Sequence, residues 1–174
     1  MKIGVLGTGI VGSTIGTKLI QLRHEVKMGS RTADNPKAVE WAKANGEKAT
    51  RGTFADAAAF GEILFNCTSG GGAIAALKSA GEKNMNGKIL VDIANALDFS
   101  KGMPPSLSVC NTDSLGEQIQ RTFPNVKVVK TLNTVNCKVM VDPSLVHHGD
   151  HDIFICGNDT AAKEKVIHIL KDWF

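Results

Sequence analysis

Tyrosine is absent from the 174-residue sequence. A reductase that protonates a carbonyl oxygen with a tyrosine hydroxyl therefore cannot be built from this chain. Cysteine is scarce, and the four cysteines are scattered without a C-x-x-C pair. This spacing favours free thiols over a disulfide framework. The four are Cys67, Cys110, Cys137 and Cys156.

Further absences narrow the function. The longest apolar runs are about six residues, far short of a membrane span. A strand is predicted so close to Met1 that a signal peptide has no room, so we expect a cytoplasmic protein. The net charge is only +3, and no basic run interleaved with aromatics occurs, so a nucleic-acid partner is not expected. The absence of G-x-S-x-G removes the commonest serine hydrolase arrangement.

The amino-terminal stretch combines a strand, a glycine-rich loop and a helix. Lys2–Leu6 is an apolar run of strand length, and Ser13–Leu22 has the apolar spacing of a helix. The loop between them follows the pattern G-x-G-x-x-G and consists of Gly7, Thr8, Gly9, Ile10, Val11 and Gly12. The first glycine permits a tight turn, the second lets a pyrophosphate approach the backbone, and the third lets the helix pack closely on the strand. In this context the pattern predicts a dinucleotide-binding site at the helix N-terminus.

The end of the next predicted strand, Glu25–Met28, indicates which dinucleotide. An NAD-binding protein places an acidic residue about 20 residues after the glycines, where it binds the ribose 2′-hydroxyl. Here Gly29-Ser30-Arg31 stands in its place, and Lys37 follows shortly after. A hydroxyl, a guanidinium and an ammonium suit a 2′-phosphate instead. We therefore predict NADP(H) as the cofactor.

Strands and helices alternate along the rest of the chain. The further expected strands are Lys48–Thr50, Ile63–Cys67, Lys88–Ile93, Lys127–Leu132 and Asp152–Cys156. The further expected helices are Asn35–Asn45, Phe54–Phe60 with Thr53 as its cap, Ala73–Ala80, a helix that a Ser114–Glu117 capping box opens, and a last one that runs to Trp173. Residues 98–113 and 143–151 are expected to be irregular. This order predicts an α/β fold, with one Rossmann-type domain over residues 1–174, a doubly wound, mostly parallel sheet and helices on both faces.

Ligands of such sheets bind beyond the carboxyl ends of the strands. The loops expected there span residues 7–12, 29–32, 68–72, 94–98 and 133–137. They contain no His or Lys, and Asp98 is their only acid, while Lys130 is interpreted as a solvated or interface residue of a strand. Carbonyl reduction needs a proton donor, whereas hydride transfer to a conjugated ring such as a flavin or deazaflavin needs chiefly the alignment of two rings. The loops favour the second chemistry.

Several short motifs occur in a fixed order along nearly the whole chain. They are the glycine loop, Gly29-Ser30-Arg31, Asp92-Ile93-Ala94-Asn95, Asn111-Thr112-Asp113-Ser114-Leu115-Gly116-Glu117, Lys130-Thr131-Leu132-Asn133-Thr134 and Gly157-Asn158-Asp159. In order and spacing, the chain resembles the coenzyme F420-dependent NADP oxidoreductase family. The same domain type resembles the cytosolic part of membrane metalloreductases, which use FAD.

The resemblance implies NADP(H) as cofactor, F420 or a flavin as co-substrate, and no dedicated catalytic proton donor. At the phosphates, it implies that Thr8, Ile10 and Val11 surround the pyrophosphate and that Ser30, Arg31 and Lys37 hold the 2′-phosphate. At the nicotinamide, it implies that Thr68 and Ser69 border the ribose and that Asn95 and the backbone of Val135, Asn136 and Cys137 position the carboxamide. The deazaflavin would then stack on the open face of the nicotinamide ring.

Alternatives stay open at this point. One is an NADPH-dependent reductase of a small imine or carbonyl, with Asp98 or a water as proton source, and another is a non-catalytic NADPH-sensing module. Relatives usually continue with a further strand and helix beyond Trp173-Phe174, which would complete the acceptor pocket or a dimer contact. We expect a small-molecule electron acceptor or donor and a homodimer as partners. The histidine-rich stretch His147–Asp152 is interpreted as a polar loop, and no metal is expected.

Overall fold

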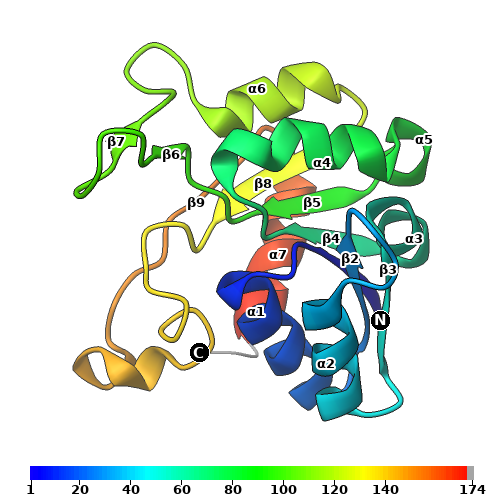
Figure 1. Ribbon diagram of the computed structural model, residues 1–174. Helices are drawn as coiled ribbons and strands as arrows, with labels where there is room; N and C mark the ends of the chain where they lie inside the picture. The colour runs from blue at the N-terminus through cyan, green and yellow to red at the C-terminus, as the bar shows by residue number, and fades with distance from the viewer. Residues whose placement is uncertain (172–174) are drawn as a thin grey trace.

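The structure is a computed structural model that describes residues 1–171. In this part of the chain, a seven-stranded sheet has the order β3-β2-β1-β4-β5-β8-β9. Its strands are β1 (Lys2–Leu6), β2 (Glu25–Ser30), β3 (Ala49–Thr53), β4 (Ile63–Asn66), β5 (Ile89–Asp92), β8 (Lys127–Thr131) and β9 (Ile155–Cys156). Neighbouring strands are parallel except β8 and β9, which pair in antiparallel register. The predicted Rossmann-type α/β fold is confirmed (Figure 1).

Helices cover both faces of the sheet. They are α1 (Ile10–Gln21), α2 (Pro36–Asn45), α3 (Phe54–Phe60), the short turn η1 (Gly70–Gly72), α4 (Ala73–Ala80), α5 (Glu82–Met85), α6 (Leu115–Thr122) and α7 (Thr160–Lys171). α1, α2 and α7 pack on one face, and α3 to α6 pack on the other. Ile3 and Val5 of β1 belong to the first core, whereas Leu6 belongs to the second. Because both faces are buried, the strand is apolar without alternation.

A glycine lets α1 and α2 pack closely. A Cβ on Gly16 would lie 2.8 Å from Cζ2 of Trp41, so a larger residue would push the indole ring away from α1. The Trp41 indole N–H donates to the hydroxyl of Thr17 at 3.1 Å, and the residue is only 6% exposed. Trp41 therefore fixes α2 against the helix that follows the glycine loop.

Several boundaries in the amino-terminal half differ from the prediction. The strand expected over Lys48–Thr50 covers Ala49–Thr53, and the one expected over Ile63–Cys67 ends at Asn66. Two other differences lie at the candidate site. α1 begins at Ile10 rather than Ser13, so the residues of the G-x-G-x-x-G pattern divide between a short loop and the first turn of the helix. β2 continues to Ser30 rather than ending at Met28, because β3 pairs with it as far as Thr53. The predicted phosphate-binding residues therefore lie within, or directly beside, helices and strands.

Helix capping differs between α3 and α6. Thr53 caps α3 in a complete capping box with Asp56, as the Thr53 prediction requires. The hydroxyl and main-chain N–H of Thr53, which both donate to Asp56, hold the pKa of that carboxyl below its ordinary value. At α6 the predicted box is only half formed. The Ser114 hydroxyl accepts from the Glu117 N–H, but the Ser114 N–H donates to Asp113 instead of Glu117.

The last two predicted elements also need adjustment. The strand expected over Asp152–Cys156 is shortened to Ile155–Cys156, because only these residues pair with β8. The last helix is described as far as Lys171, and its predicted end at Trp173 lies outside the described residues. Within residues 1–171, no helix combines the length and apolar character needed to cross a membrane.

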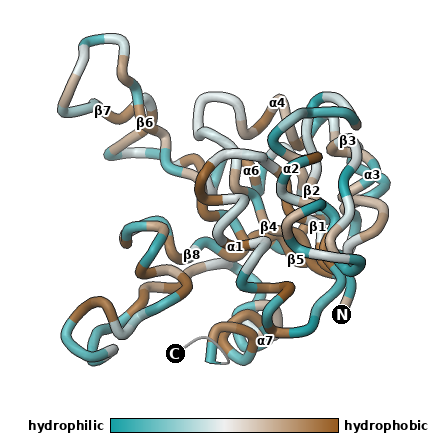
Figure 2. Tube along the Cα trace, turned by 60° about the horizontal axis from the view of Figure 1, so that its bottom comes forward, coloured by the Kyte–Doolittle hydropathy of each residue, from teal (hydrophilic) through white to brown (hydrophobic). Residues whose placement is uncertain are grey.

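Two long segments leave the carboxyl end of the sheet. Residues 97–113, here called the arm, contain the short antiparallel pair β6 (Leu97–Asp98) and β7 (Ser106–Leu107). Residues 132–154, here called the 132–154 loop, contain the turns η2 (Pro143–Leu145) and η3 (His147–Gly149). Both extend from the same end of the molecule (Figures 1 and 2). Their exposed large apolar side chains include Leu97, Phe99, Met103, Leu107, Leu145 and Phe154.

Candidate functional site

The glycine loop lies where the strand order of the sheet reverses, between β1 and β4. Gly7 has a φ of +122°, and a Cβ there would lie 2.6 Å from the carbonyl oxygen of Cys67. A Cβ on Gly12 would lie 2.2 Å from the oxygen of Gly7, so α1 can begin this close to β1 only with glycine. By contrast, nothing lies within 4 Å of a Cβ on Gly9. Two glycines therefore shape the protein, and Gly9 leaves room for a ligand.

The N-terminus of α1 is open to an anion. Its first turn has neither a side-chain cap nor an acidic residue. Ser13 is the first residue of the helix whose N–H bonds a main-chain oxygen, that of Gly9, at 2.9 Å. The N–H groups of Ile10 and Val11 precede this bond, and the Ile10 side chain is 72% exposed. Together with Thr8, these residues form a backbone-lined cradle, the kind of helix N-terminus at which phosphate groups bind.

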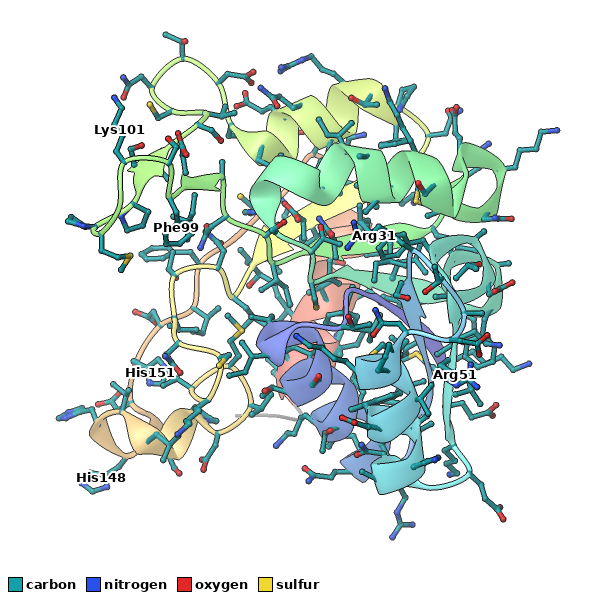
Figure 3. All side chains as sticks on the ribbon, viewed as in Figure 1. Arg31, Arg51, Phe99, Lys101, His148 and His151 are labelled. Carbon is teal, nitrogen blue, oxygen red and sulfur yellow. The ribbon has the colours of Figure 1, made fainter. Side chains whose placement is uncertain are left out.

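The residues predicted to hold a 2′-phosphate lie at the end of β2 and the start of α2. Ser30 is buried, and its hydroxyl donates to the Thr32 carbonyl at 2.5 Å and accepts from the Thr32 N–H at 3.3 Å, so it also shapes the turn. Arg31 and Lys37 are exposed, and neither side chain forms an ion pair with the described residues. Their positive charges are therefore free to meet an anionic ligand, and Figure 3 shows where Arg31 lies.

Arg51 supports this turn, and the sequence gives no local indication of it. From β3, its guanidinium donates to the carbonyl oxygen of Ala33 at 2.6 Å and to the carboxylate of Asp34 at 2.8 Å. Arg51 lies opposite Met28 in the register of β2 and β3. The pairing of these strands therefore brings a second arginine to the segment that carries Arg31.

A cavity of about 450 Å³ opens beside the glycine loop, beyond β1, β4 and β5. Of the predicted site residues, those that line it are Val11, Thr68, Ser69, Asn95, Val135 and Cys137. Asn136 is exposed and outside the lining, and its side-chain oxygen accepts from the Lys138 N–H at 3.0 Å. The sequence prediction missed several lining residues, among them the apolar side chains of Leu97, Phe99 and Met140. Phe99 comes from the arm and approaches the 132–154 loop (Figure 3).

The lining carries almost no ionisable group. No Asp, Glu, His, Lys or Arg is among the described residues that line the cavity. Cys67 contributes a thiol whose pKa burial raises well above its ordinary value, so it stays protonated. Asp98 lies outside the lining, and hydrogen bonds from the Ser100 main-chain and side-chain groups keep its pKa below the ordinary value. Asp98 is therefore deprotonated at neutral pH and has no proton to give.

A buried polar chain runs behind the cavity. Lys130 donates to Asp92 at 2.8 Å, Asn66 donates to Asp92 at 2.7 Å, and Thr68 donates to Asn66 at 2.7 Å. Asn66 and Asp92 are fully buried, and the Lys130 side chain is 19% exposed. The interpretation of Lys130 as a solvated or interface residue is therefore wrong. Its ammonium pairs with the buried carboxylate of Asp92, which lies opposite it in the register of β5 and β8.

A second cavity, of about 440 Å³, lies on the α6 side of the buried polar chain. Asn95 and Asn133 line both cavities, and each side chain bonds the other residue, at 2.7 and 3.1 Å. The second cavity does not include the glycine loop or α1. We therefore place the candidate site in the first cavity.

The histidine-rich turn does not assemble a metal site. Within residues 1–171, no group of three or more His, Cys, Asp or Glu side chains is arranged to hold a metal ion. His147 and Asp150 approach to 3.9 Å, and both are exposed.

The fold and the cradle are those of a dinucleotide-binding α/β protein. Residues 2–96 match the sequence model of the family described as NADP oxidoreductase, coenzyme F420-dependent. The F420-dependent NADP reductase of Methanocaldococcus jannaschii is 32% identical to this chain in an alignment that is 180 residues long, gaps included. The alignment covers 97% of this chain and 78% of that protein. This chain belongs to the F420-dependent NADP oxidoreductase family, and the predicted resemblance is confirmed.

Solved structures agree with the assignment. A protein from Arthrobacter sp. FB24, proposed to be an F420-dependent NADP reductase, is 53% identical with a TM-score of 0.93, covering 99% of this chain and 80% of that one. An imine reductase from Streptomyces aurantiacus shares the fold alone, at 17% identity and a TM-score of 0.71, over 99% of this chain and 53% of that one. The family's name implies NADP(H) and F420. The predicted homodimer remains a prediction.

Proposed function

We propose that this protein is an NADP(H)-dependent oxidoreductase that exchanges hydride between the nicotinamide and a flat conjugated ring, with F420 as that ring. One observation carries the proposal beyond the family assignment: the cavity next to the cradle is lined by apolar and uncharged polar side chains and has no charged side chain in its lining. Such a lining suits the stacking of two rings and offers no acid for a carbonyl oxygen. The reduced nicotinamide supplies the hydride when bound.

The chain's own residues bind and align. The α1 N-terminus and the glycine loop hold the pyrophosphate, and Arg31 with Lys37 holds the 2′-phosphate. Thr68 and Asn95 present polar groups to the nicotinamide riboside from two adjacent strand ends. Phe99 and Met140 provide apolar surface that excludes water from the acceptor side. In this proposal, catalysis rests on the relative orientation of two rings in a dry cavity.

Titration calorimetry with NADPH and NADH tests the cofactor assignment. Wild-type protein should bind NADPH more tightly than NADH. Arg31→Ala should weaken NADPH binding roughly tenfold to hundredfold, because it removes charge-assisted hydrogen bonds to the extra phosphate. It should leave NADH binding unchanged. Lys83→Ala, which removes an exposed charge on α5, should change neither affinity. Equal affinities of the wild type for both cofactors would overturn the assignment.

A second assay identifies the acceptor. NADPH oxidation is followed with F420, with FMN, and with a panel of small imines and carbonyls. Turnover with F420 or FMN and none with the panel supports the proposal. Turnover with the panel alone would favour imine or carbonyl reduction. Tight NADPH binding without oxidation by any acceptor would favour the sensing module.

A further inference from the structure

The polar chain of Lys130, Asp92, Asn66 and Thr68 has a fixed direction. An ion-paired carboxylate only accepts hydrogen bonds, so Asn66 must turn its NH₂ group toward Asp92. Its amide oxygen then faces Thr68, and both the hydroxyl and the main-chain N–H of Thr68 donate to that oxygen, at 2.7 and 3.3 Å. The Thr68 hydroxyl proton is thereby committed to Asn66.

This direction determines what Thr68 offers to a ligand. Thr68 lines the cavity, and with its proton committed its oxygen can only accept. The matching ligand group is a donor, and a ribose hydroxyl is such a donor. We propose that Asp92 and Lys130 are positioning residues that fix Thr68 as the acceptor for a hydroxyl of the nicotinamide ribose. This inference rests on the proposed NADP(H) site.

The polar chain also connects the loops after β4 and β5, between which we place that ribose. The Asp92 carboxylate accepts from the Ala94 N–H at 3.3 Å, and Lys130 donates to the Ala94 carbonyl. A Cβ on Gly70 would lie 2.1 Å from the Asn95 carbonyl oxygen, so the loops after β4 and β5 are in direct contact. These contacts lie on the nicotinamide side, away from Arg31 and the 2′-phosphate turn. A change at Asp92 should therefore act on one half of the cofactor only.

The test compares two ligands on the full chain. NADPH contains the nicotinamide riboside, and adenosine 2′,5′-bisphosphate lacks it. In Asp92→Asn, the Asn66 side-chain amide can flip, because residue 92 no longer only accepts hydrogen bonds. The Thr68 hydroxyl proton is then no longer committed to Asn66, and Thr68 is no longer fixed as an acceptor. We expect Asp92→Asn to weaken NADPH binding about tenfold and to leave the affinity for the bisphosphate within twofold. A parallel loss for both ligands would show a merely structural role and overturn the proposal.

A double-mutant cycle tests the route through Thr68. Thr68→Val removes the hydroxyl with little change of shape and should weaken NADPH binding to the same extent, whereas Thr68→Ser should not. Adding Asp92→Asn to Thr68→Val should cause no further loss, because the two act through one contact. Additive losses would overturn the proposal.

Three further outcomes can be told apart. If Asp92→Asn does not fold because it leaves a charge unpaired, the neutral pair Asp92→Asn/Lys130→Met replaces it, with the same expected split between the two ligands. If the wild type binds neither NADPH nor the bisphosphate, the proposed function itself fails. Wild-type binding of both ligands, with no NADPH-specific loss in any variant, overturns only the role of the polar chain.

Discussion

The two ends of the candidate site, the proposed phosphate end and the proposed acceptor end, are built differently. The phosphate end consists of short turns that follow directly from buried strands, and Gly7 and Gly12 have no room for a side chain. The acceptor end consists of the arm and the 132–154 loop, where Phe99 and Met103 are 55% and 79% exposed. The difference separates two tasks. Backbone held by the sheet fixes the invariant part of a cofactor, whereas longer segments supply the surface that meets a particular acceptor.

Two phenylalanines give the sharpest test of this comparison. Phe65 of β4 is fully buried in the core that α1, α2 and α7 cover, so Phe65→Ala should lower the free energy of unfolding by about 3–5 kcal/mol. Phe99→Ala should change it by less than about 0.5 kcal/mol yet slow hydride exchange with a ring acceptor. Urea unfolding and acceptor kinetics measure the two effects. A large loss of stability in Phe99→Ala would mean that the arm is part of the core.

Two glycines of the G-x-G-x-x-G pattern are expected to act on different properties, one on stability and the other on cofactor binding. Gly12→Ala should cost about 1–3 kcal/mol of stability, because its Cβ would meet the Gly7 carbonyl oxygen. Gly9→Ala meets no atom within 4 Å and should leave stability nearly unchanged. It should nevertheless weaken NADPH binding, because the new methyl group occupies the space left for the pyrophosphate. Thermal unfolding and calorimetry distinguish the two, and unchanged NADPH affinity in Gly9→Ala would place the phosphates elsewhere.

Arg51→Met examines the phosphate turn with a smaller expected effect. Loss of the contacts to Ala33 and Asp34 loosens the segment that carries Arg31. NADPH affinity should fall several-fold, and stability should change by less than about 1 kcal/mol, because the Asp34 side chain of the ion pair is 88% exposed. Arg121→Met is the matched control at the acceptor end, where the arginine pairs with Asp113. It should leave NADPH affinity unchanged, and an equal loss in both variants would indicate a nonspecific charge effect.

The smallest effect is expected at Asp113, where the arm joins α6. Hydrogen bonds from Arg121 and Gln118 lower the pKa of Asp113 from 3.8 to about 2. A carboxyl whose pKa is lower in the folded state than in the unfolded state stabilises the protein at pH values above the unfolded-state pKa. This stabilisation is lost as the pH falls through the folded-state pKa. The wild type should therefore unfold at a slightly higher temperature than Asp113→Asn at pH 6, and this difference in unfolding temperature should vanish between pH 4 and 2. Thermal scans across that range check it, and a constant difference would exclude the carboxylate as its cause.

Local patterns account for what the sequence could predict. The apolar β1, the glycines after it and the Thr53 cap of α3 are each determined by neighbours within a few residues. The turn with Ser30 and Arg31 was likewise predictable, because it follows the next strand at a regular distance. These elements define the Rossmann fold and the proposed phosphate end of the site.

Partners that strand pairing brings together escaped prediction. Lys130 and Asp92 are separated by 38 positions in the sequence, and their contact depends on the register of β5 and β8. Arg51 reaches the turn after β2 only because β3 lies beside it. Phe99 reaches the cavity through the path of the arm, which no local periodicity determines. The acceptor end was therefore the least predictable part.

The contact between Trp41 and α1 provides an optical probe of the phosphate cradle. The chain has two tryptophans and no tyrosine, so light of a wavelength too long for phenylalanine to absorb excites only indole. Indole emits where reduced nicotinamide absorbs, and Trp41 is fixed against the helix whose N-terminus forms the cradle. Excitation energy should pass from this ring to bound NADPH but not to NADP⁺, which would make fluorescence a direct signal of the cofactor's redox state.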